Sequence, residues 1–168
     1  MKKPDQAEIH PLPFEPCPLT DFKQTQTLQA TEASLSKTDH LPPSDATTIN
    51  QELDRIGILA NTVAHQYEII SLIGLPSVSR DVALMAKLAS SSCAKAVNAC
   101  FRKNTNEAYA AQEDYTALAQ TYHRLSARFY SALGQPDSPV ETLMAGWAVV
   151  ACIAKIGHHA SRIATMTA

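Results

Sequence analysis

The sequence predicts an all-α protein, an antiparallel up-down helical bundle of four long helices, and three observations carry this prediction. After about residue 46, apolar residues recur at alternating steps of three and four, which places them on one face of a helix. Glycine and proline interrupt this periodicity at Gly74 and Pro76 and again at Gly134 and Pro136, where we expect helices to end. No segment shows the strict alternation that is typical of a half-buried strand.

Residues 1–46 differ in composition from the rest of the chain. Seven of the ten prolines lie before residue 46, whereas all five glycines lie after it. The segment is rich in Gln, Thr and Ser and holds few large apolar residues, so burial cannot offset the entropy lost on ordering. We therefore predict a disordered Pro/Gln/Thr-rich head over 1–46 and a helical bundle domain over 47–168.

The four helices are expected near 47–74, 77–103, 106–133 and 139–166, and each is roughly 40 Å long. Because the connections between them are short, sequential helices should run antiparallel. The face expected to be buried on the first helix comprises Ile49, Leu53, Ile56, Ala60, Val63, Tyr67 and Ile70. The face expected on the second is made of smaller residues, among them Val82, Met85, Ala89, Ala96 and Ala99.

Capping signals support the starts of the last two helices. Asn104 and Glu107 have the spacing of a capping box before the third helix. Ser138 is the expected cap of the fourth helix, with Pro139 at its first position and Glu141 reaching back to the cap.

Two segments, 55–64 and 155–164, share one pattern at an offset of 100 residues: a basic residue, Ile-Gly-x-x-Ala-x-x, a β-branched residue and Ala. Glycine inside a helix costs about 1 kcal/mol relative to alanine, so two glycines at equivalent positions need a physical reason. Small residues let helices approach closely, and we predict that the first and fourth helices cross here. The predicted crossing motif comprises Arg55, Gly57, Ala60, Lys155, Gly157 and Ala160.

The two copies of this motif resemble the phosphate-uptake regulator family known as PhoU. Members of that family consist of two three-helix repeats, and the third helix of each repeat carries a motif close to Glu-Arg-Ile-Gly-Asp-His-Ala. The corresponding stretches here are residues 54–60 and 154–160. The resemblance covers about residues 47–168, and it implies a PhoU-like bundle that contains the last four of six helices.

The metal-binding acids of the family are mostly replaced in this chain. In the family, acids at the first and fifth motif positions form pairs suited to metal ions. Here the first copy has Asp54 and Ile58 at these positions, and the second has Ala154 and His158. The resemblance thus leaves Asp54 and His158 as an eroded metal site.

Two ligands do not hold an ion tightly against water, so we expect no cofactor and no stoichiometric metal. Any weak uptake of a divalent metal should depend on His158 rather than on His159, because only His158 occupies an acid position of the motif. The two adjacent side chains diverge by about 100° on a helix and cannot clamp one ion from one face.

Catalytic motifs are absent from the sequence, which has no glycine-rich phosphate loop, no Gly-x-Ser-x-Gly and no Glu-x-x-His. A net charge of −2 argues against nucleic-acid binding. The longest nearly uncharged window, 142–154, is too short to span a bilayer, and prolines interrupt residues 1–18 where a signal peptide would lie. We expect a cytoplasmic, non-enzymatic protein without membrane insertion.

Two functional hypotheses remain open. By resemblance, the chain would be a regulator of phosphate transport or phosphate signalling that forms a homodimer and contacts a phosphate ABC transporter or its sensor kinase. Alternatively, it is a structural helical adaptor that has lost metal binding and phosphate signalling. Neighbouring genes for phosphate-transport components would favour the first hypothesis.

Overall fold

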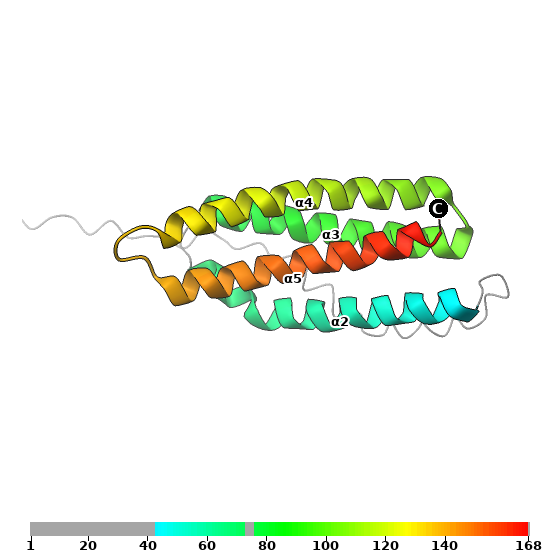
Figure 1. Ribbon diagram of the computed structural model, residues 1–168, viewed down its shortest axis with the longest axis horizontal. Coiled ribbons are helices and arrows are strands. Elements are labelled where there is room, and N and C mark those ends of the chain that lie inside the picture. The colour runs from blue at the N-terminus through cyan, green and yellow to red at the C-terminus, as the bar shows by residue number, and fades with distance from the viewer. Residues whose placement is uncertain (1–42, 73–75, 168) are drawn as a thin grey trace, which may run out of the picture.

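The computed structural model describes residues 43–72 and 76–167 and contains four helices there (Figure 1). The helices are α2 (Pro43–Leu72), α3 (Pro76–Arg102), α4 (Thr105–Leu133) and α5 (Val140–Thr165). Successive helices run in opposite directions, and no strand occurs in the described ranges. The predicted all-α, up-down fold is therefore confirmed, with helix bounds within a few residues of those expected.

The predicted head lies outside the described residues, except for its last four, 43–46, which form the first turn of α2. Proline is tolerated in this turn because the first amides of a helix have no intrahelical partner. Asp45 in the same turn lies near the positive end of the helix dipole. Side chains are described for 45–66 and 78–167, so the expected burial of Tyr67 and Ile70 also lies outside the described part.

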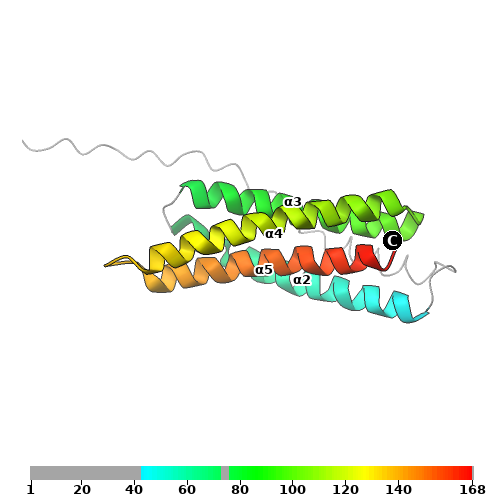
Figure 2. The ribbon, with the colours of Figure 1, turned by 45° about the horizontal axis from the view of Figure 1, so that its top comes forward.

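Helix α5 is the element on which the others pack. Helices α2, α3 and α4 each lie along it, and α3 also packs against α4, whereas α2 and α3 barely touch (Figures 1 and 2). The described chain is therefore a three-helix unit, α3 to α5, with α2 docked on α5.

The sequence of α5 explains its central position. Adjacent buried residues recur every seven positions at 149–150, 156–157 and 163–164. Because adjacent side chains on a helix diverge by about 100°, these pairs give α5 a wide buried arc. The buried apolar stripe of α2 is narrower and comprises Ile49, Leu53, Ile56, Ala60 and Val63.

By length and composition, α5 is also the one helix of the described residues that could cross a membrane. The expectation rested on window 142–154 alone, whereas a window of 18 residues within α5 is apolar enough to meet this criterion. The core helix of a soluble protein meets the same criterion, and α5 packs against three other helices.

The predicted Asn104 cap of α4 is confirmed, but the reciprocal bond of a capping box is not formed, because the Asn104 amide donates to the Ala99 carbonyl at 3.1 Å. The Asn104 side chain accepts hydrogen bonds from the amides of Asn106 and Glu107, at 3.1 and 3.4 Å. Two of the otherwise unpaired amides of the first turn are thereby satisfied.

The predicted cap of α5 is wrong. Pro139 occupies the cap position and makes no side-chain cap bond. The Ser138 hydroxyl instead donates to the Gln135 carbonyl at 2.6 Å and so closes the preceding turn, in which Asp137 has a positive φ of 63°. A serine hydroxyl has one proton, and here it serves the turn rather than the helix.

The two motif copies do meet where α2 packs on α5, but their glycines differ. Ile56 and Ile156 are both buried, as are Ala60 and Ala160. Gly157 is buried, whereas its counterpart Gly57 is only half-buried.

The close contact of Gly157 is made with α4 and not, as we expected, with α2. A Cβ atom at Gly157 would lie 2.9 Å from Cδ1 of Leu118 and 3.3 Å from Cδ2 of Tyr115. The glycine pattern correctly indicated that a helix approaches α5 closely at Gly157. Which helix does so depends on the side of α5 on which Gly157 lies, and that side faces α4.

We expect Gly157→Leu to lower the free energy of unfolding by roughly 1–3 kcal/mol, because the side chain would overpack against Leu118. Urea denaturation measures the change. The matched control is Gly134→Leu, since Gly134 is exposed and a Cβ there would make only ordinary contacts, the nearest at 3.6 Å. Equal midpoints for the wild type and Gly157→Leu would contradict the close packing of α5 on α4.

Candidate functional site at the crossing of α2 and α5

A buried carboxylate lies at the crossing of α2 and α5. Glu52 is only 1% exposed and stands among the apolar residues Ile49, Leu53 and Ile56 of the α2 stripe. Glutamate is almost never fully buried without partners, because the loss of hydration strongly disfavours its charged form. The side chains that surround Glu52 therefore determine whether its charge is stabilised at this crossing.

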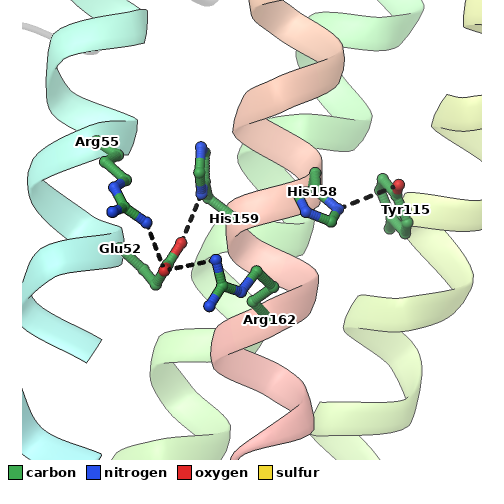
Figure 3. A network of polar contacts seen from close by, with 6 residues as sticks. All are labelled: Glu52, Arg55, Tyr115, His158, His159 and Arg162. Atoms are coloured by element: carbon green, nitrogen blue, oxygen red, sulfur yellow. Dashed lines mark hydrogen bonds and ion pairs between the residues drawn. The ribbon is translucent and has the colours of Figure 1, made fainter. Parts of the chain in front are cut away.

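Three cationic or polar side chains surround Glu52 (Figure 3). Nη1 of Arg55, one turn further along α2, lies 3.0 Å from Oε1, and Nη1 of Arg162 on α5 lies at the same distance from the same oxygen. Nδ1 of His159, also on α5, lies 2.5 Å from Oε2. An ionised carboxylate only accepts, so in the ionised state of Glu52 the donor of this bond is Nδ1 of His159. The carboxylate thus links α2 to α5.

Three protein donors compensate for the burial of Glu52. A buried ion pair gains stability only when its geometry is good and its remaining lone pairs are also bonded. Both carboxylate oxygens are bonded here, while Arg55 and Arg162 keep 51% and 48% of their side-chain surface exposed. If one partner is removed, the arginines can be hydrated but Glu52 cannot, so the loss of stability should come mainly from the unpaired buried carboxylate.

The predicted metal residues lie elsewhere. His158 is exposed on the side of α5 that faces α4, where its Nδ1 lies 3.4 Å from the Tyr115 hydroxyl (Figure 3). Asp54 is exposed on α2. Of the two adjacent histidines, His159 reaches α2 and His158 does not, because adjacent side chains diverge on a helix. Among the described residues no hydrogen bond or ion pair joins Asp54 to His158, and no group of three metal-ligating side chains occurs.

Sequence reasoning missed Glu52 and Arg162, although one signal was available. Glu52 is an acid one position before Leu53, inside the apolar stripe of the first helix. An acid at such a position calls for a cationic partner on a facing helix. The partners on α5 follow 107 residues or more later, so their identity depends on how α2 and α5 align.

Other polar clusters of the described residues join helices and offer no reactive group. Asp114 on α4 accepts from Ser91 and Lys95 on α3, at 2.6 and 2.7 Å. Burial raises the pKa of the Cys93 thiol to about 12, so this thiol stays protonated and unreactive at neutral pH.

Comparison with known proteins identifies one family. A family model described as the PhoU domain matches residues 82–167, which include most of α3 and all of α4 and α5. The matched range coincides with the three-helix unit and leaves α2 outside. Neither the curated proteins nor the solved structures that were searched contain a match.

We expect Arg162→Met to destabilise the fold by about 1–3 kcal/mol, because the buried Glu52 carboxylate loses a donor. Adding Glu52→Met should recover most of that loss, since no buried charge then remains. The control is Arg128→Met, because Arg128 is about as exposed as Arg162 while its partner Asp81 keeps 15% of its side-chain surface exposed, and this change should cost about 0–1 kcal/mol. Urea midpoints showing that Arg162→Met costs no more than Arg128→Met would contradict the role of Glu52.

We also expect the purified, untagged protein to hold less than one metal ion per chain after dialysis, as measured by elemental analysis. If zinc or nickel is added, any weak uptake should fall with His158→Ala and persist with His159→Ala, because the His159 ring is engaged by Glu52. One or more ions per chain that survive dialysis would refute this expectation.

Proposed function

The chain belongs to the PhoU domain family, and from this premise we propose that it is a non-enzymatic regulator of phosphate transport or phosphate signalling. The observation that carries the proposal is the family match over 82–167, which covers half of the chain and nearly the whole three-helix unit. We further propose that the protein is cytoplasmic and acts through contacts of its helix surfaces with a phosphate ABC transporter or its sensor kinase.

One surface is well suited to such contacts, and we call it the hairpin patch: Tyr130 at the end of α4, with Val140, Met144 and Trp147 at the start of α5. The first three are exposed by 64%, 53% and 46%. The α5 residues share one helix face, and the Trp147 and Tyr130 ring centroids lie 6.2 Å apart. Tyrosine, tryptophan and methionine are enriched at protein interfaces.

Deleting the gene in its native host should change the rate of phosphate uptake in phosphate-rich medium, and the wild-type gene should restore it. A Tyr130→Ala/Met144→Ala variant should fail to restore it, because the hairpin patch loses its apolar surface. Tyr109→Ala is the matched control, since Tyr109 is also exposed on α4, by 58%, but lies outside the patch. Unchanged uptake on deletion would contradict the proposed function, and full rescue by the double variant would exclude the patch.

The structural adaptor is the second candidate. Ile58, which stands at an acid position of the family motif, is 68% exposed, so this position presents an apolar group to solvent. A deletion that leaves phosphate uptake unchanged would favour the adaptor.

Helix α2 carries exposed residues whose counterparts on α5 are packed. Ala64 is exposed whereas its counterpart Ala164 is fully buried, and Gly57 is half-buried whereas Gly157 is buried. Ile58, about 100° further round α2, adds an exposed apolar side chain. We propose that a second copy of the chain covers these residues, since α5 shows that the same motif supports helix packing there.

Multi-angle light scattering should therefore give a dimer for the wild type and a smaller mass for Ile58→Lys, because a charge at this position disfavours burial. Leu84→Lys on α3 is the control, since Leu84 is also exposed, by 43%, but lies outside the proposed interface. A wild-type monomer at high concentration would contradict the proposed dimer.

A further inference from the structure

The Glu52 carboxylate brings two arginines of different helices together. Nη1 of Arg55 and Nη1 of Arg162 each lie 3.0 Å from the same Oε1 atom, so the two nitrogens are separated by at most twice that distance, 6.0 Å. His159 holds the other oxygen and fixes the carboxylate from the α5 side. The two guanidinium groups are therefore positioned before any ligand arrives.

Most of the hydrogen-bonding capacity of these arginines remains available. A guanidinium carries five N–H donors, and the bonds to Glu52 engage Nη1 of each. About half of each side chain is exposed, so the remaining donors can reach a ligand from solvent. Within the described ranges, Glu52 is the carboxylate that pairs with them.

The charge of the cluster is positive. Lys155 lies one turn before His159 on α5, is exposed, and forms no ion pair within the described part of the chain. Arg55, Lys155 and Arg162 outnumber the single negative charge of Glu52. Asp54, next to Arg55, is the nearest other acid in sequence; it is exposed and points away from Arg55 by about 100° on the helix.

We propose that Arg55 and Arg162, with Lys155 at the edge, bind a tetrahedral oxyanion such as inorganic phosphate on the solvent side of Glu52. The planar fork of a guanidinium matches two oxygens of such an anion, and charge-assisted bonds of this kind are strong. This inference goes beyond the proposed function, which concerns protein contacts, and it rests on the geometry of the cluster alone.

The chain contains an internal comparison. Asp81 on α3 pairs with Arg124 and Arg128 of α4, at 3.4 and 2.7 Å. These arginines come from one helix and contact separate carboxylate oxygens, so no shared atom draws their Nη atoms together. Arg124 and Arg128 are about as exposed as Arg55 and Arg162, and the Asp81 cluster should lack the proposed site, which makes it a control.

Isothermal titration of the full-length protein with inorganic phosphate, at constant ionic strength, tests the proposal. The wild type should show saturable binding, and Arg55→Gln/Arg162→Gln should weaken it about ten-fold or more. Arg124→Gln/Arg128→Gln should bind as the wild type does. Sulfate should compete with phosphate, and chloride at the same ionic strength should not.

Circular dichroism shows whether each variant folds. If Arg55→Gln/Arg162→Gln unfolds, Arg55→Lys/Arg162→Lys keeps the charge while removing the fork, and it should still lose most of the phosphate affinity. Absence of saturable phosphate binding by the wild type, or equal loss in the Asp81-cluster variant, would overturn the proposal. Because purified protein suffices, failure here leaves the result of the gene deletion unaffected.

Discussion

Packing on three sides of α5 is the constraint on which the rest of the structure depends. Helices α2, α3 and α4 all require a face on α5, so its buried arc has to be wide and its residues small where neighbours approach. Gly157 meets this requirement toward Leu118, and Ala160 and Ala164 are fully buried. Larger residues at these positions would force the neighbouring helices apart, because the interior of a protein is packed as densely as an organic crystal.

The same motif serves two different environments in this chain. On α5 Ile156, Gly157, Ala160, Ile163 and Ala164 are all buried, whereas on α2 only the stripe through Ile56, Ala60 and Val63 is covered. Among the described residues, α2 makes nearly all of its helix–helix contacts with α5, and Asp54, Ile58 and Ala64 on α2 are exposed. The Glu52 cluster lies where α2 packs on α5. The same arginines that link Glu52 across the two helices therefore also form the positive surface at this contact.

Periodicity was sufficient to predict the fold but not to assign neighbours. The spacing of residues such as Leu53 and Ile56 indicates that a face is buried, yet it carries no information about which helix covers that face. For this reason the burial of Gly157 was predicted and its contact with α4 was not. The caps show a similar limit on a local scale. The Asn104 side chain caps α4 as predicted, whereas the Ser138 hydroxyl could bond either the preceding turn or the helix and in fact bonds the turn.

The candidate site was harder to predict than the fold. The motif directed attention to Asp54 and His158, but contacts across the crossing belong to Glu52, His159 and Arg162. A shift of one residue along a helix rotates a side chain by about 100°, so the functional face depends on the register between α2 and α5. That register is set by apolar packing over the whole length of both helices and not by the motif itself.

The central claim is that a self-sufficient three-helix unit carries α2 as a separately attached element. Native-state hydrogen exchange of the full chain tests this claim most directly, because it measures the free energy of opening for each helix. Amides of α2 such as those of Ile56 and Val63 should exchange through an opening that leaves α3 to α5 protected. Amides of α4 such as that of Leu118 should exchange only on global unfolding. If amides of α2 and α4 share one opening free energy, the chain is a single cooperative bundle and the claim is wrong.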